Sequence, residues 1–377
     1  MKAGLLGPFP PFRGGIATFN THLYRTLAER VDVVALNYRR QYPGWIFPGR
    51  TQLDESACPF TVGSVTVFDP FRPWRWPADL RALDALALDW LLLSLWTPLF
   101  APSLWLFLSI WQRRSGRPML AVCHNVRPHE SIPLTGFFQT RLLRRLAGVA
   151  VHWQGDADQL HGWLPGTPVA TLFHPLYDSF PREPGLDRTA ARRRLGLPEE
   201  ARVLLFFGLV RPYKGLDLLL EAFQSLADAD ARLHLLVAGE FYEPPGKYEP
   251  RLGQLRQANR LTLHDRFIPN ERVADYFTAA DAVVLPYRSA TQSGIVPLAY
   301  AMGRGVVASR VGGVPEMVED GVTGILVPPA DAPELASGIA RFLDGQSAIE
   351  SAVPGMAARF GWPRYADGLL ELARRVV

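Results

Sequence analysis

Short apolar runs alternate with amphipathic stretches along the chain of 377 residues. The apolar runs are rich in Val, Leu and Ala and carry little charge, which is typical of strands buried on both faces of a parallel sheet. The stretches between them place apolar residues at helical spacing over about 10–15 residues. This alternation predicts an α/β protein with doubly wound parallel sheets.

Two sets of this alternation follow each other along the sequence. The first predicts strands at 2–6, 31–36, 88–96, 119–123, 149–153 and 169–173, with helices at 16–30, 103–114 and 137–146. The second predicts strands at 203–207, 233–238, 261–264, 282–285 and 305–309, with helices at 215–226, 249–259, 272–280 and after Gly294. We therefore expect two Rossmann-like domains that face each other, joined by a Pro-rich linker over 176–185. Residues 38–80, dense in Pro and aromatic residues, predict no clear order of elements.

One apolar run is long enough to challenge this interpretation. Residues 90–111 hold no charged side chain, and about 20 apolar residues suffice to cross a bilayer. Pro98 and Pro102 interrupt the run in its middle, and another strand-like segment follows at 119–123. The run therefore predicts a strand, a loop and a helix of the first sheet rather than a membrane-spanning helix.

The composition fits a folded enzyme. Hydrophobic residues make up 48% of the chain and charged residues 20%, which excludes an intrinsically disordered protein. The two cysteines, Cys58 and Cys123, are too few for a disulfide framework or a zinc site. The N-terminal apolar stretch is too short for a signal peptide, so we expect a cytoplasmic protein.

Charge is distributed unevenly. Residues 1–175 hold 17 Lys or Arg residues against 11 Asp or Glu residues, although the net charge of the whole chain is only +4. A basic first half favours an anionic partner or peripheral contact with the inner face of the plasma membrane. The only lysines are Lys2, Lys214 and Lys247. Because the chain otherwise uses arginine, a lysine within an anion-binding pattern is stronger evidence for an anion site.

Ligands of doubly wound sheets bind beyond the carboxyl ends of the strands, where loops lead into helices. Gly14 and Gly15 precede the first helix and allow an anion to approach the main chain, although a plain tight turn has the same pattern. Residues 207–215 place Arg211 and Lys214 at a strand–helix turn. Two cations there fit a diphosphate, and the alternative is an exposed loop with incidental charges.

A third loop, 290–295, precedes a predicted helix. Ser293 is a good capping residue, and Gly294 leaves the first amides of the helix accessible, so a phosphate fits there. Capping without any ligand explains the same residues.

A fourth loop begins directly after the apolar run 119–123. His124 lies at the carboxyl end of that predicted strand, where it suits a ligand site or a structural hydrogen bond. His129 and Glu130 follow, and either shape an acceptor pocket or belong to a solvated loop.

Two Asp-x-Asp motifs raise the question of a metal-bridged diphosphate. Asp156 and Asp158 fit the start of a helix, whereas Asp228 and Asp230 fit the end of one. Helix termini explain both motifs better than metal binding does, and we predict no metal.

The segments 203–224 and 276–329 resemble the donor-binding domain of family 4 glycosyltransferases. FRGGIATF and AVCHNVRPHE in the first half are similar to the glycine loop and the active-site histidine of that family, and FGWPRYADGLLELARR is similar to its closing tryptophan and helix. The resemblance covers essentially the whole chain and is weakest at 38–110. It implies a GT-B fold, with an acceptor-binding Rossmann-like domain at 1–175, a nucleotide-sugar donor-binding Rossmann-like domain at 176–355 and a C-terminal helix at 356–377 that crosses back to the first domain.

The resemblance also implies roles for individual residues. It assigns catalytic roles to His124, Arg211 and Lys214, donor diphosphate binding to Gly14, Gly15, Arg211, Lys214, Ser293 and Gly294, donor sugar binding to Thr291 and Gln292, and contact with the nucleotide base to Phe267 and Ile268. The chain departs from the family at two positions, because Thr291 and Ala299 stand where the family commonly has a pair of glutamates. This departure leaves the identity of the donor open.

The activity implied is transfer of a hexose from a nucleoside diphosphate sugar to a glycan, lipid-linked or small-molecule acceptor, with retention of anomeric configuration. No cofactor, metal or nucleic acid is expected. Two alternatives remain. A catalytically silent sugar-nucleotide-binding protein is suggested by the missing glutamates, and a sugar-nucleotide epimerase would need an acidic cluster that the sequence does not show.

Overall fold

The structure is a computed structural model that describes residues 1–44, 47, 49–126 and 135–377. The chain divides into two compact units. Unit 1 comprises Met1–Asp54, Pro59–Phe173 and Trp362–Val377, and unit 2 comprises Glu55–Cys58 and His174–Gly361.

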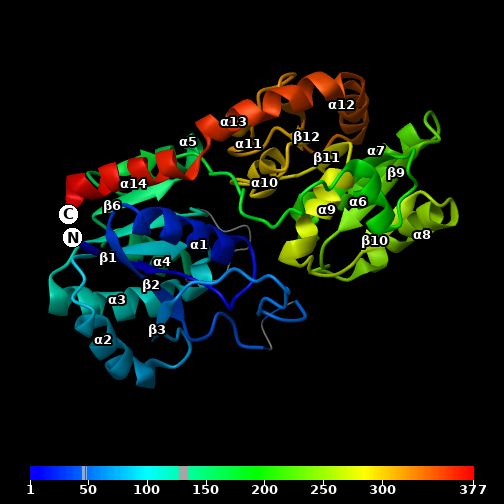
Figure 1. Cartoon of the computed structure of the whole chain (residues 1–377). Coiled ribbons are helices and arrows are strands. Elements are labelled where there is room, and N and C mark those ends of the chain that lie inside the picture. The colour runs from blue at the N-terminus through cyan, green and yellow to red at the C-terminus, as the bar shows by residue number, and fades with distance from the viewer. Residues whose placement is uncertain (45–46, 48, 127–134) are drawn as a thin grey trace. The chain divides into compact units, whose positions relative to one another are not determined.

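Unit 1 is built on a seven-stranded parallel sheet with the order β3-β2-β1-β4-β5-β6-β7 (Figure 1). Its strands are β1 (Lys2–Leu6), β2 (Asp32–Tyr38), β3 (Ser64–Phe68), β4 (Trp90–Leu95), β5 (Met119–Cys123), β6 (Gly148–Val151) and β7 (Val169–Thr171). Its helical segments are α1 (Gly15–Ala28), η1 (Pro73–Arg75), α2 (Trp76–Ala85), η2 (Pro98–Phe100), α3 (Ala101–Ser115), α4 (Thr135–Leu143), α5 (Gln154–Trp163) and α14 (Trp362–Val376). The C-terminal α14 packs against α1 and against β6 and β7, whereas α2 contacts α3 and β3.

Unit 2 is built on a six-stranded parallel sheet with the order β10-β9-β8-β11-β12-β13. Its strands are β8 (Arg202–Phe207), β9 (Leu233–Ala238), β10 (Leu261–His264), β11 (Ala282–Leu285), β12 (Val306–Ser309) and β13 (Gly324–Val327). Its helical segments are α6 (Arg188–Leu195), η3 (Pro212–Lys214), α7 (Leu216–Ala227), η4 (Pro245–Lys247), α8 (Glu249–Gln257), η5 (Asn270–Arg272), α9 (Val273–Ala279), α10 (Ile295–Ala301), α11 (Val314–Met317), α12 (Ala332–Ala352), η6 (Val353–Gly355) and α13 (Met356–Arg359).

The apolar runs of the sequence are the central strands of these sheets. Every residue of β4, β5 and β9 is buried, because helices cover both faces of each sheet. The two sheets and their order confirm the predicted α/β class with two doubly wound parallel sheets. The strands predicted at 119–123, 233–238, 261–264 and 282–285 have the bounds of β5, β9, β10 and β11.

The apolar run 90–111 confirms the prediction of a strand, a loop and a helix. It forms β4, the turn η2 and most of α3. Pro98 is the first residue of η2 and Pro102 the second of α3, where the missing amide costs no hydrogen bond. No helix within the described residues is long and apolar enough to cross a membrane.

The unit boundaries differ in two details from the expected domains. The short helix α13 contacts α10 and groups with unit 2, so the C-terminal segment that joins unit 1 begins at Trp362 rather than at residue 356. Residues Glu55–Cys58 also group with unit 2, where the carboxylate of Glu271 accepts hydrogen bonds from the amides of Ala57 (3.0 Å) and Cys58 (3.3 Å).

Candidate functional site

The loop between β8 and α7 carries both predicted cations. It leaves the sheet at Gly208, makes the turn η3, and enters α7 through Gly215. Gly208 and Gly215 have φ angles of 96° and 69°, which residues with a Cβ rarely adopt. A Cβ on Gly215 would lie 2.0 Å from the carbonyl oxygen of Pro286, and one on Gly208 would lie 3.1 Å from Nζ of Lys214. Glycine at both positions therefore sets the path of the loop and leaves room for the lysine amino group.

Lys214 is a half-buried cation with a perturbed pKa. Burial first, and the charge of Arg211 second, lower its pKa to about 8. Within the described part of the chain, Lys214 forms no ion pair with a carboxylate. An anion that binds next to Lys214 and Arg211 supplies the missing counter-charge and raises the lowered pKa of the lysine.

Each cation lies over the face of a tyrosine. The amino group of Lys214 is 5.7 Å from the ring centroid of Tyr287, and the guanidinium carbon of Arg211 is 5.0 Å from that of Tyr242. An aromatic face attracts a cation but leaves its charge in place. The ring of Tyr287 therefore leaves the positive charge of Lys214 available to a ligand.

The loop between β11 and α10 lies next to Lys214. Oγ of Ser293 accepts a hydrogen bond from the amide of Ile295 (3.1 Å) and makes a second one with the hydroxyl of Tyr287 (3.2 Å). Gly294 lies against the ring of Tyr177, from which a Cβ would be 3.4 Å away. The prediction that Ser293 caps the helix is wrong, because the N-cap of α10 (Ile295–Ala301) is Gly294 and no side chain caps this helix; Ser293 instead holds the turn that precedes it.

The positions that depart from the family pattern have different surroundings. Thr291 is buried, and its carbonyl oxygen accepts a hydrogen bond from the amide of Gly313 (2.8 Å), while the neighbouring Gln292 is half-buried. Ala299 is completely buried within α10. A small residue at position 299 thus belongs to the core of unit 2 rather than to its surface.

Phe267 and Ile268 lie between β10 and η5. Ile268 is buried and Phe267 is half-buried. Their assignment to the nucleotide base remains a prediction.

In unit 1, Gly14 and Gly15 lie at the start of α1. The φ angle of Gly14 is 108°, and its carbonyl oxygen accepts a hydrogen bond from the amide of Thr18 (3.1 Å), the first bond of the helix. A Cβ on either glycine would meet no heavy atom of the described residues within 4 Å. The N-terminus of α1 is therefore sterically accessible, as a site for an anion requires.

His124 follows β5 directly and is buried. Its Nε2 lies 3.2 Å from Oγ of Ser94, and its ring packs edge-on against Phe19 with the centroids 4.7 Å apart. His152 lies on another side, with its ring centroid 5.1 Å away, and hydrogen-bonds to the hydroxyl of Tyr365 (3.1 Å). His124 thus belongs to an aromatic cluster at the carboxyl ends of β4, β5 and β6. His129 and Glu130 lie outside the described residues.

The Asp-x-Asp motifs occupy helix termini, as predicted. Asp156 and Asp158 lie at the start of α5, and Asp228 is the C-terminal capping position of α7. Asp230 accepts hydrogen bonds from the amide and the guanidinium of Arg232. Among the described residues, no three His, Cys, Asp or Glu side chains are grouped as a metal site would need.

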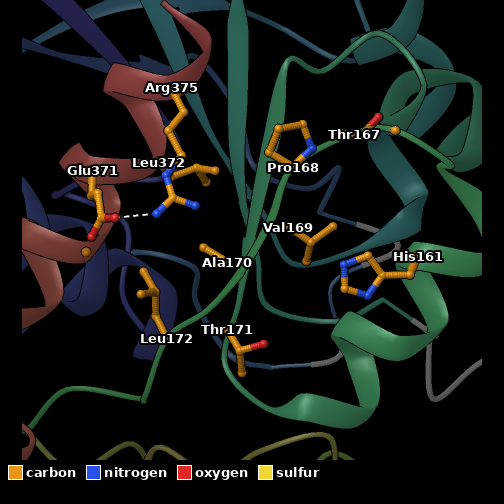
Figure 2. Close-up of a pocket in the computed structure, with 12 residues that line it drawn as sticks. His161, Thr167, Pro168, Val169, Ala170, Thr171, Leu172, Glu371, Leu372 and Arg375 are labelled. Carbon is orange, nitrogen blue, oxygen red and sulfur yellow. Dashed lines mark hydrogen bonds and ion pairs between the residues drawn. The ribbon is translucent and has the colours of Figure 1, made fainter.

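A cavity of about 520 Å³ lies elsewhere in unit 1, along the edge strand β7. Figure 2 shows Glu371 and Arg375 of α14 on one side of it and His161 of α5 on the other. The cavity is lined by none of the predicted site residues.

Within unit 2 the structure therefore brings together Lys214, Ser293 and Gly294, with Arg211 on the same loop as Lys214. Tyr287 connects them and was not predicted from the sequence, because a tyrosine that follows a buried strand is indistinguishable from a core residue. Tyr242 and Tyr177 lie in loops, where no sequence pattern indicates their contacts.

The sequence of unit 2 matches a known family model. Residues 201–345, which include β8 to β13 and all the unit 2 site residues, match the model "Glycosyl transferases group 1".

Two D-inositol 3-phosphate glycosyltransferases are among the curated proteins to which this chain is similar. The protein of Geodermatophilus obscurus is 36% identical over 226 residues, covering 57% of this chain and 49% of its own length. One from Catenulispora acidiphila is 36% identical over 234 residues, covering 59% and 56%. The chain thus spans about half the length of the curated relatives that it matches.

Solved structures resemble this chain over its full length. Anabaena HepE in complex with UDP and glucose has a TM-score of 0.73 at 18% identity, and each chain is covered completely. Sucrose-phosphate synthase from Thermosynechococcus elongatus has a TM-score of 0.72 at 20% identity, over 99% of this chain and 98% of that one. These likenesses confirm the GT-B fold expected from the sequence.

Proposed function

We propose that the protein is a glycosyltransferase that transfers a hexose from a nucleoside diphosphate sugar to an acceptor with retention of anomeric configuration. The observation that carries this proposal is the half-buried Lys214 beside Arg211, on the loop after β8, with a pKa lowered to about 8. Two adjacent cations at the carboxyl end of a doubly wound sheet suit a diphosphate. The loop also lies within the part of the chain that matches the group 1 model.

The chemistry follows from where charge develops. When the bond between the sugar and the phosphate breaks, the electron pair stays on the leaving diphosphate, and Lys214 and Arg211 stabilise that charge in the transition state. The acceptor hydroxyl attacks the same face of the sugar, and its proton passes to the leaving phosphate oxygen. This route needs no carboxylate as general base, which suits a site where Thr291 and Ala299 replace a glutamate pair.

For the donor we propose a UDP-sugar, since the structurally similar HepE is described in complex with UDP and glucose. Thr291 and Gln292 are proposed to hydrogen-bond the sugar, Ser293 and Gly294 to contact the diphosphate, and Phe267 and Ile268 to contact the base. The buried Ala299 has no group that could hold the ribose. We therefore expect main-chain atoms or other side chains of unit 2 to bind the ribose.

For unit 1 we propose acceptor binding, with His124 as a catalytic residue and with Gly14 and Gly15 offering their main chain to an anionic substrate group. The relatives named for D-inositol 3-phosphate suggest a small anionic acceptor, and the basic charge of residues 1–175 agrees with an anion. A lipid-linked acceptor would present the same chemistry at a membrane.

Peripheral contact with an anionic membrane is a further part of the proposal for unit 1. Trp74, Leu106 and Phe137 are large apolar side chains that are 73%, 46% and 54% exposed. The guanidinium of Arg141 lies 4.5 Å from the ring centroid of Phe137. Exposed aromatic residues beside cations suit the interface of an anionic bilayer.

A catalytically silent sugar-nucleotide-binding protein remains the second candidate, because Thr291 and Ala299 cannot ionise. Two measurements separate the candidates. A screen of nucleotide sugars by thermal shift identifies the donor, since a ligand stabilises the fold in proportion to its affinity and concentration. Release of free nucleoside diphosphate from that donor then indicates a transferase, whereas stabilisation without release indicates the silent protein.

A further inference from the structure

Tyr287 joins the two loops of the candidate donor site, and the proposed function gives it no role. It follows β11 after Pro286 and is only 4% exposed. Its ring lies under the amino group of Lys214, 5.7 Å from the centroid, and its hydroxyl lies 3.2 Å from Oγ of Ser293. One side chain thus contacts the cation of the first loop and Ser293 in the second.

The surroundings restrict where Tyr287 can move. Its ring packs edge-on against Tyr213, with the centroids 6.4 Å apart, and Gly215 lies directly against the carbonyl oxygen of the preceding Pro286. On the far side, Ser293 is held by the amide of Ile295. The ring and the hydroxyl therefore occupy defined positions between the two loops.

We propose that Tyr287 is the positioning residue of the donor diphosphate site, supporting the amino group of Lys214 with its ring and fixing the turn at Ser293 with its hydroxyl. This inference rests on the proposed function, because it assumes that Lys214 meets the diphosphate. Tyr287 acts through Lys214 and Ser293 and does not itself contact the substrate.

The choice of a tyrosine has a physical reason. A carboxylate at this position would neutralise Lys214 and compete with the diphosphate, whereas an aromatic ring holds the cation without neutralising it. Burial raises the pKa of the Tyr287 hydroxyl well above its ordinary value, so the phenol stays neutral at any physiological pH. The groups that face Lys214 are then the cation of Arg211, the neutral phenol of Tyr287 and the glycine at position 208.

The test uses the scarcity of lysine in the chain. Only Lys2, Lys214 and Lys247 are present, so NMR of protein labelled at the lysine side chains follows the titration of Lys214 directly, with Lys214→Arg assigning the signal. The variants are Tyr287→Leu, which removes ring and hydroxyl, and Tyr287→Phe, which removes the hydroxyl alone. The matched control is Tyr300→Phe, because Tyr300 is an equally buried tyrosine of unit 2 whose hydroxyl bonds Thr323 (2.8 Å).

The expected results differ among the variants. Tyr287→Leu moves the titration of Lys214 from about 8 towards the ordinary lysine value, since the amino group becomes better hydrated, and weakens binding of UDP at least about tenfold. Tyr287→Phe leaves the titration in place and weakens UDP binding by a smaller factor, because only the turn at Ser293 is loosened. Tyr300→Phe changes neither. If Tyr287→Leu fails to fold, the smaller effect of Tyr287→Phe on UDP affinity still decides the role of the hydroxyl.

An unchanged titration of Lys214 and an unchanged affinity for UDP in folded Tyr287→Leu would overturn the inference. If the parent protein binds no nucleoside diphosphate, the proposed function itself is wrong, and so is the role of Tyr287 at the donor site. The titration is read without any ligand, so the two failures are distinguishable.

Discussion

The amino group of Lys214 lies over the ring of Tyr287 and within 3.1 Å of where a Cβ on Gly208 would be, so it is enclosed by an aromatic face and a glycine. This enclosure removes water from the cation without supplying a counter-charge. The result is a lysine whose pKa is lowered to about 8, first by burial and second by the charge of Arg211.

The lowered pKa predicts that binding of UDP depends on pH. A bound diphosphate favours the charged lysine and raises its pKa, so above about pH 8 the complex holds one more proton than the free protein. Affinity for UDP should therefore be constant below about pH 8 and fall as the pH rises, by up to about tenfold per pH unit. Calorimetric titration over this range measures the effect.

Lys214→Arg is the control, because a guanidinium stays charged throughout and removes the dependence on pH. A parent protein whose affinity for UDP is the same at about pH 7 and about pH 10 would show that Lys214 does not meet the diphosphate.

His124 should affect transfer more than binding of the nucleoside diphosphate. His124→Gln removes the imidazole that contacts Ser94 and is expected to lower the rate of transfer by about 10²-fold, a typical loss for one hydrogen-bonding group of an active site. The affinity for UDP should change little, since that site lies in unit 2. The exposed His161 of α5 provides the control, and His161→Gln should transfer at the parent rate. Equal losses of transfer rate and UDP affinity in folded His124→Gln would contradict this division of roles.

Activity is expected to survive removal of divalent metal. Lys214 and Arg211 supply the charge that a metal would otherwise supply to the leaving diphosphate, and no metal-binding group of side chains exists among the described residues. The measurement is the rate of nucleoside diphosphate release before and after dialysis against excess EDTA. If EDTA abolishes this release and magnesium or manganese restores it, the assignment of the charge-stabilising role to Lys214 and Arg211 is wrong. Asp156 and Asp158 then become the candidate metal ligands.

Unit 1 should bind anionic vesicles at low salt. Phe137 and Arg141 are expected to contribute an apolar and a charged contact, so Arg141→Glu weakens sedimentation with anionic vesicles, and added salt weakens that of the parent protein. Arg193→Glu changes charge equally at an exposed position of unit 2 and should leave binding unchanged. If the parent protein does not bind anionic vesicles at low salt, the proposed contact with a membrane is wrong.

The central strands could be predicted from sequence because burial on both faces leaves an unmistakable apolar run, as in β5 and β9. The strand β3 and the helix α2 could not, since their segment is crowded with prolines and aromatic residues. The helix α6 was missed because its sequence, RTAARRRL, is dominated by arginine, and its place in the fold depends on Arg192, which is buried against Asp281 at 2.6 Å.

Some residues of the candidate site could likewise be predicted from the sequence, and others could not. Arg211, Lys214 and Ser293 could be predicted from their positions after strands, because loops at the carboxyl ends of a parallel sheet meet at one edge. Tyr287 could not, because its contact with Lys214 arises only when β8 and β11 become neighbours in the sheet. Sequence distance between these strands hides the relationship.

The most direct test of the central claim is the release of UDP from UDP-sugars by the parent protein and by the Arg211→Ala/Lys214→Ala variant. If the two cations stabilise charge that develops in the transition state, each loss lowers turnover by about 10²–10³-fold, and Lys214→Arg retains more activity than Lys214→Ala. The fold should survive, because loop cations contribute little to stability. We expect UDP release by the parent and almost none by the folded double variant. Release at the parent rate by the double variant, or tight donor binding by a parent that releases no UDP, would contradict a transferase that works through these residues.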